Sequence, residues 1–146
     1  MEKYKILVVD DESRMRKLVS DFLVKNQYQV LEAADGEEAL DVFFRENDIA
    51  LVILDVMMPR MDGWQVCKEI RAESKVPIIM LTAKNDERDE LQGFELGVDE
   101  YISKPFSPKI LVARVGAILR RTVQASAEAK LEAGGSVEDK SAQSVT

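Results

Sequence analysis

The chain has 146 residues, a formal net charge of −7 and a hydrophobic content of 46%, which is enough apolar material for one compact domain. Its acidic balance, with a pI of about 4.8, disfavours direct binding to nucleic acid or to an anionic membrane, because both attract basic surfaces. Histidine is absent and cysteine occurs once, which excludes Ser-His-Asp catalysis, Cys-His catalysis and an internal disulfide.

Short apolar runs alternate with amphipathic segments, a rhythm that predicts a parallel sheet covered by helices on both faces. The first predicted strand is Lys5 to Val9, and an edge strand is predicted at Tyr28 to Glu32. Asp35 and Glu38 form a capping box at the start of a second helix. The apolar residues at helical spacing are Met15, Leu18, Val19, Phe22 and Leu23 in the first helix and Ala39, Leu40, Phe43 and Phe44 in the second.

The run from Ala50 to Leu54 is wholly apolar and stops at Asp55. Such a run is expected for a central strand that is buried on both faces of the sheet. The loop after it is marked by Pro59 and Gly63, and the inward-facing residues of the third predicted helix are Val66 and Ile70.

The strand and helix pattern continues in the second half of the chain. Pro77 opens the strand Ile78 to Leu81, which ends at Thr82. A fourth helix is predicted over Asp86 to Leu96, and Gly97 stops it. The last strand contains Tyr101 and Ile102, and the last helix has Ser107 as its N-cap, Pro108 in its first turn and its end near Arg121. Five such units predict a flavodoxin-like, doubly wound α/β fold.

Residues 122–146 differ from the rest of the chain because they lack aromatic residues and are rich in Ala, Ser, Glu, Gly and Lys. We expect a domain over residues 1–121 and a flexible linker or tail over residues 122–146. No apolar run approaches the roughly 20 residues that span a bilayer, and the N-terminal residues do not resemble a signal peptide. Together with the lone Cys67, this favours a cytoplasmic protein with no membrane partner.

Polar residues stand where the predicted strands end, namely Asp10, Asp11, Asp55, Thr82 and Lys104. Taken singly, each has an ordinary explanation as a helix cap, a turn residue, a strand-end hydroxyl or a solvated lysine. In open α/β sheets, however, the ligand crevice lies outside the carboxyl ends of the strands, so these residues should meet at one edge. Their convergence predicts a functional site.

The three predicted neighbours Asp10, Asp11 and Asp55 would repel one another unless a cation lay among them. Oxygen ligands and few protein carboxylates favour Mg²⁺. Asp55 can then attack phosphorus and form an aspartyl-phosphate, while the metal and the Lys104 ammonium neutralise the phosphoryl oxygens.

Four segments of the chain closely resemble the receiver domains of response regulators. They read ILVVDDE at 6–12, LVILDVMMPRMDGWQV at 51–66, IIMLTAK at 78–84 and GVDEYISKPFSP at 97–108, and the resemblance covers residues 3–121. It implies a CheY-like fold with five helices and a five-stranded parallel sheet of order 2-1-3-4-5. It also implies two-component signal transduction in which a sensor histidine kinase supplies the phosphoryl group, with no enzymatic activity beyond self-phosphorylation and self-dephosphorylation.

The resemblance assigns a role to each matching position. Asp55 corresponds to the phosphoacceptor, Asp11 to a direct Mg²⁺ ligand, Asp10 to a ligand acting through water, Met57 to a ligand through its backbone carbonyl, and Lys104 to the residue that binds the phosphoryl group. The peptide bond before Pro105 is expected to be cis. Thr82 and Tyr101 resemble the switch pair, in which the threonine hydroxyl moves to the phosphoryl group and the tyrosine ring turns inward. The alternative for Tyr101 is a half-buried aromatic residue of an edge strand.

The segment SPKILVARVGAILRR at 107–121 is similar to receivers that precede a winged-helix DNA-binding domain, the OmpR/PhoB type. This implies transcriptional regulation and a homodimer, formed on phosphorylation through the fourth helix, last strand and last helix. The expected interface residues are Leu91, Phe94, Ile110 and Ala113 as an apolar patch, with Glu100 and Arg114 as an ion pair. Glu90 and Ile110 depart from the group, which usually has a base and an acid there. The alternatives are an exposed helix without a partner and a stand-alone receiver that acts through protein contacts.

Two other functions are compatible with the fold class. A phosphatase of the haloacid dehalogenase type needs an acid two residues after its nucleophile, where this chain has Met57. A flavodoxin needs a phosphate-binding loop after the first strand, where Asp10, Asp11 and Glu12 would repel phosphate. Both are disfavoured. Trp64 and Cys67 are interpreted as packing or surface residues.

Overall fold

The computed structural model describes residues 3–82 and 97–135, with side chains as far as residue 122. Five parallel strands form one sheet in the order β2-β1-β3-β4-β5, which confirms the predicted fold class and strand order. The strands are β1 (Lys5–Val9), β2 (Gln29–Ala33), β3 (Ile49–Asp55), β4 (Ile78–Thr82) and β5 (Glu100–Ser103). The described helices are α1 (Ser13–Lys25), α2 (Gly36–Arg45), α3 (Gly63–Arg71) and α5 (Pro108–Gly135).

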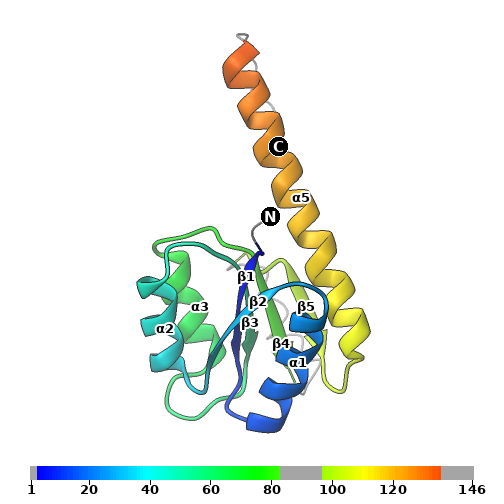
Figure 1. Cartoon of the computed structure of the whole chain (residues 1–146). Coiled ribbons are helices and arrows are strands. Elements are labelled where there is room, and N and C mark those ends of the chain that lie inside the picture. The colour runs from blue at the N-terminus through cyan, green and yellow to red at the C-terminus, as the bar shows by residue number, and fades with distance from the viewer. Residues whose placement is uncertain (1–2, 83–96, 136–146) are drawn as a thin grey trace.

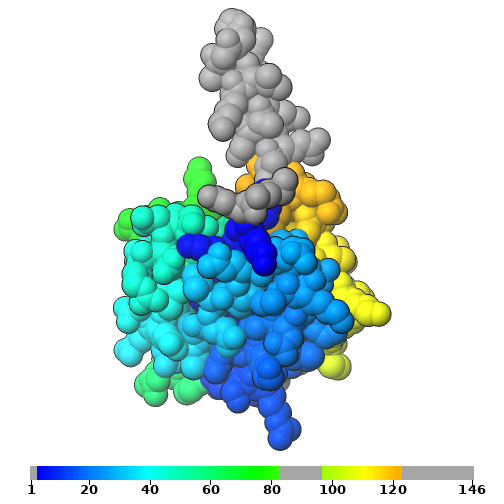
Figure 2. All heavy atoms as spheres, in the orientation of Figure 1, coloured from blue at the N-terminus to red at the C-terminus, as the bar shows by residue number. Residues whose placement is uncertain are grey.

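Helices cover both faces of the sheet, with α2 and α3 on one side and α1 and α5 on the other (Figure 1). Alternate residues of each strand point to opposite faces, so β1 places Leu7 and Val9 in one buried cluster and Ile6 and Val8 in the other. Residues 51–55 of the central strand β3 are all buried, so the apolar run predicted to be buried, Ala50 to Leu54, is buried except for the half-buried Ala50. In the space-filling view, the residues of α2 (cyan) lie at the left and those of α1 (blue) at the lower right (Figure 2), in keeping with their places on opposite sides of the sheet.

Side-chain caps set the start of two helices. The Glu38 backbone N–H donates to Asp35 Oδ1 at 2.8 Å, as the capping box predicted. In return Glu38 Oε1 accepts a hydrogen bond from the Ala34 N–H at 2.7 Å, one residue earlier than in the usual box. At α3, Asp62 Oδ1 accepts from the Gln65 N–H at 3.0 Å. Gly63 is therefore the first helical residue, and its assignment to the preceding loop was wrong.

The last helix is longer than the sequence indicated. It begins at Pro108, as predicted, but it continues to Gly135 instead of ending near Arg121. The division into a domain over 1–121 and a tail over 122–146 stays a prediction. The predicted fourth helix, Asp86 to Leu96, lies outside the described residues, and Gly97, expected to stop it, has a φ of 71°. Among the described helices, none combines the length and apolarity needed to cross a membrane.

Candidate functional site

Three carboxylates gather where β1 and β3 end. Asp10 follows β1, Asp11 comes next, and Asp55 is the last residue of β3. Each offers an oxygen atom that lies within 4.8 Å of the other two. Because both strands run in the same direction, their carboxyl ends share one edge of the sheet, the lower edge in Figure 1. Asp10 and Asp55 are 1% and 3% exposed, whereas Asp11 is open to solvent. The group has the chemistry of a site for a hard divalent cation.

Asp10 is held from several directions. Its backbone N–H donates to the Ala33 carbonyl at 3.2 Å, and its Oδ1 accepts from the Glu12 N–H at 2.9 Å. Its own carbonyl accepts a hydrogen bond from Arg16 Nη1 at 2.7 Å. The Arg16 side chain is anchored in turn by Glu32, whose Oε1 lies 3.0 Å from Nε. Sequence reasoning missed Arg16, since a contact from a side chain to a backbone carbonyl leaves no spacing signal.

Lys104 supplies the positive charge of the cluster. Its Nζ lies 3.5 Å from Asp10 Oδ2 and 3.5 Å from Asp55 Oδ1. Its backbone N–H donates to the Thr82 carbonyl at 2.6 Å, so pairing with the end of β4 directs the lysine toward the carboxylates. The peptide bond between Lys104 and Pro105 is cis, as the resemblance implied.

The electrostatic balance at the site is unfavourable for a fully ionised cluster. Burial, and then the charge of Asp10, raises the pKa of Asp55 from 3.8 to about 6. Lys104 and a hydrogen bond from the Met57 N–H, at 3.3 Å from Asp55 Oδ1, oppose this rise only in part. A divalent cation would remove the repulsion, so the residues fit a bound Mg²⁺.

The two residues of the predicted switch pair lie on neighbouring strands, and Thr82 lies next to Lys104 of the cluster. Thr82 is the last residue of β4 and is 1% exposed. Tyr101 on β5 pairs in register with Met80, and its ring is stacked on Trp64 of α3 with 6.3 Å between ring centroids. Trp64 was interpreted from the sequence as a packing or surface residue. Its 6% exposure and its contact with Tyr101 make it a buried neighbour of Tyr101 instead of a surface residue.

The predicted interface residues are only partly described. Ile110 is 54% exposed, and Ala113 and Arg114 of α5 also face solvent. Arg114 Nε lies 3.8 Å from Glu100 Oε2 of the same chain, so these two residues already pair within one molecule. Glu90, Leu91 and Phe94 lie outside the described residues.

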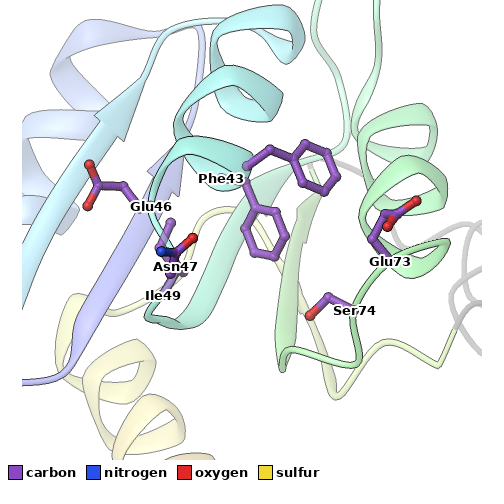
Figure 3. Close-up of a pocket in the computed structure, with 7 residues that line it drawn as sticks. Phe43, Glu46, Asn47, Ile49, Glu73 and Ser74 are labelled. Atoms are coloured by element: carbon purple, nitrogen blue, oxygen red, sulfur yellow. The ribbon is translucent and has the colours of Figure 1, made fainter.

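A separate hollow lies far from the carboxylates. It has a volume of about 310 Å³ and is lined by Phe43, Phe44, Glu46, Asn47, Ile49, Glu73 and Ser74. In Figure 3, Phe43 stands between Glu46 and Asn47 on one side and Glu73 and Ser74 on the other. These residues come from the ends of α2 and α3 and the start of β3, so the hollow lies at the amino end of the sheet.

Comparison with known proteins agrees with this geometry. The family described as "Response regulator receiver domain" matches residues 6–116. The probable transcriptional regulator ycf27 of Porphyridium aerugineum is 53% identical over 135 residues, which cover 92% of this chain and 56% of the relative. The chain spans about half the length of the curated relatives that it matches.

Solved structures give the same answer. The response regulator DrrB, a Thermotoga maritima OmpR/PhoB homologue, matches with a TM-score of 0.73 and 38% identity, over 83% of this chain and 54% of that one. A CheY-like receiver domain protein from Methanospirillum hungatei matches with a TM-score of 0.80 and 25% identity, over 84% and 98%. The fold, the acidic edge of the sheet and these matches together show that the chain belongs to the response regulator receiver domain family.

Proposed function

We propose that this chain is a phosphorylation switch in which Asp55 accepts a phosphoryl group from a sensor histidine kinase. The observation that carries the proposal is the placement of the buried Asp55 carboxylate beside two other carboxylates and the Lys104 ammonium group, with Lys104 Nζ at 3.5 Å from Asp55 Oδ1. In the transfer, an Asp55 oxygen forms a bond to phosphorus while the bond from phosphorus to the donor breaks. The Lys104 ammonium then faces the phosphoryl oxygens and offsets their charge.

Asp10, Asp11, Asp55 and the backbone carbonyl of Met57 would hold Mg²⁺. When bound, the metal neutralises charge on the phosphoryl group and on the carboxylates. The raised pKa of Asp55, to about 6, supports this assignment. It means that the ionised carboxylate is disfavoured in its surroundings, and a nearby cation would stabilise that ionised form. Arg16 keeps the Asp10 backbone in place through its 2.7 Å hydrogen bond. The Thr82 hydroxyl would donate a hydrogen bond to the bound phosphoryl group, and the Tyr101 ring would occupy its inward position in the phosphorylated state.

We also propose that the switch controls transcription through a part of the protein beyond this chain. The curated relatives are about twice as long as their matched segments, and ycf27 of Porphyridium aerugineum is described as a probable transcriptional regulator. Phosphorylation would favour a homodimer that uses the exposed Ile110 and Ala113 of α5. The pairing of Glu100 with Arg114 at 3.8 Å within one chain means that an intermolecular pair would have to replace an internal one. A receiver that acts alone through protein contacts is the second candidate. The lone cysteine, buried Cys67, supports cytoplasmic action.

Mass spectrometry tests the proposed function directly. Incubation with acetyl phosphate and Mg²⁺ should add one phosphate to the wild-type chain and none to Asp55→Asn, which keeps the shape of the side chain but loses the nucleophile. The exposed Asp41 of α2 gives a matched control, since Asp41→Asn removes one carboxylate outside the cluster and should leave labelling unchanged. A phosphate that persists in Asp55→Asn would refute the assignment. Sedimentation of the same samples tests whether the phosphorylated wild-type chain forms the proposed homodimer.

A further inference from the structure

Trp64 is buried and has an unusual environment. The residue is 6% exposed, and its indole Nε1 has no hydrogen-bond partner within the described part of the chain. Its ring lies against the ring of Tyr101, with centroids 6.3 Å apart and planes inclined by 22°. Both side chains pack on the same core cluster, formed by α2, α3 and one face of the sheet.

The residue before Trp64 joins α3 to the strand that carries Asp55. The Gly63 N–H donates to the Val56 carbonyl at 2.9 Å. A Cβ atom at Gly63 would lie 2.3 Å from the Asp55 carbonyl oxygen, so no side chain fits between the first turn of α3 and this backbone. A displacement of the Asp55 peptide must therefore displace Gly63 and Trp64 as well, because closely packed atoms transmit strain.

We propose that Trp64 is a positioning residue of the switch. Its indole forms the wall on which Tyr101 rests in the inward orientation, and through Gly63 it couples that orientation to the backbone of Asp55. The inference rests on the proposed function, since it concerns the regulation of the same site. In this structure the stack forms with Tyr101 packed against the same core cluster as Trp64, so it stabilises this inward-packed orientation. Any ligand that favours this orientation binds more tightly when the stack is present.

A set of substitutions tests the proposal, with the affinity for beryllofluoride and Mg²⁺ measured by fluorine NMR of the bound anion. Trp64→Leu removes the stacking surface and should weaken binding by about 3- to 10-fold. Trp64→Phe keeps an aromatic surface, removes the unpaired N–H and should stay within about twofold of wild type. Ile70→Val, in the same helix and cluster, is the matched control and should not change the affinity.

The double variant separates coupling from a general loss of packing. Trp64→Leu should weaken binding in the wild-type background but add little in a Tyr101→Leu background, since its partner is already gone. The chain contains one tryptophan, so beryllofluoride should change the emission of the wild-type protein and leave that of Tyr101→Leu nearly unchanged.

Additive effects of the two substitutions, or wild-type affinity in folded Trp64→Leu, would overturn the inference. Urea unfolding identifies a variant that has merely lost stability. If Trp64→Leu is such a variant, two other measurements decide the question, namely the beryllofluoride affinity of Trp64→Phe and the change in tryptophan emission of the wild-type chain. If the wild-type chain took up neither phosphate nor beryllofluoride, the proposed function itself would fail, which is a different result from binding without coupling.

Discussion

The two ends of the sheet arrange charge in opposite ways. At the amino end, Lys5 Nζ lies 3.3 Å from Glu46 Oε1 and 3.0 Å from Asp48 Oδ1, so opposite charges face each other. At the carboxyl end, three carboxylates lie within 4.8 Å of one another, with Lys104 as their cation among the described residues. The first arrangement lowers the energy of the folded chain by itself. The second does so only when a cation binds.

The pKa shifts at the two ends express the same contrast. Hydrogen bonds to Asp48 and Glu46 raise the pKa of Lys5, which favours its charged form. Burial and the charge of Asp10 raise the pKa of Asp55 to about 6, which disfavours its charged form. A rise in pKa therefore marks a satisfied cation at one end and an unsatisfied anion at the other. The second condition is typical of a site that awaits a ligand.

The largest effect that we expect is on stability without metal. In EDTA at pH 7.5, the free energy of unfolding of Asp55→Asn should exceed that of wild type by on the order of 2 kcal/mol. The reason is that the ionised Asp55 carboxylate destabilises the folded wild-type chain. The pKa of Asp55 is higher in the folded chain than in the unfolded chain, so this cost is fully present above about pH 6. It disappears as the pH falls from 6 toward 3.8. Urea unfolding at pH 7.5 and pH 4.5 measures the difference.

With Mg²⁺ present, the wild-type chain should become more stable than Asp55→Asn. The metal binds the folded wild-type chain and raises its free energy of unfolding with concentration, whereas Asp55→Asn lacks one ligand and should gain less. Asp41→Asn serves again as the control carboxylate. A stability difference between wild type and Asp55→Asn that does not change with pH would contradict the electrostatic origin that we give to it.

Much of this contrast could be predicted from the sequence. Apolar runs that end abruptly at Asp55 and Thr82 predict buried parallel strands, and parallel strands deliver their terminal residues to one edge. The meeting of Asp10, Asp55 and Lys104 follows from that rule, whereas the strand order was implied by the resemblance to receiver domains. The metal, phosphoacceptor and switch roles of these residues stay predictions.

Other features depend on three-dimensional contacts or on competing signals. Nothing in the spacing of Trp64 and Tyr101 indicates that their rings stack, because the contact joins α3 to β5 across the core. The end of α5 was placed near Arg121 because the residues beyond it lack aromatic side chains and are rich in small and polar residues. Those residues are rich in Ala, Glu and Lys, which have high helix propensity, and the helix continues to Gly135.

A smaller effect is expected from Arg16, which holds the Asp10 carbonyl at 2.7 Å. Arg16→Lys keeps the positive charge, but a lysine ammonium lacks the planar guanidinium group that bonds Glu32 and the Asp10 carbonyl at the same time. We expect about a threefold loss of Mg²⁺ affinity, which corresponds to the low end of the range for a hydrogen bond. Thermal unfolding at increasing Mg²⁺ concentration measures it. Arg14→Lys, at an exposed position of the same helix, should have no effect, and equal losses in the two variants would remove Arg16 from the site.

The smallest effect should come from the amino end. Lys5→Met keeps an apolar stem of similar length but leaves Glu46 and Asp48 without their shared cation. Both carboxylates can turn to water, so we expect the midpoint of thermal unfolding to fall by about 2 °C at low salt and by less at high salt. The Mg²⁺ affinity should not change, because the substitution lies at the far end of β1 from Asp10. A change in Mg²⁺ affinity as large as that of Arg16→Lys would mean that the charges at the two ends of the sheet are coupled, and the division between a structural end and a ligand-binding end would then be wrong.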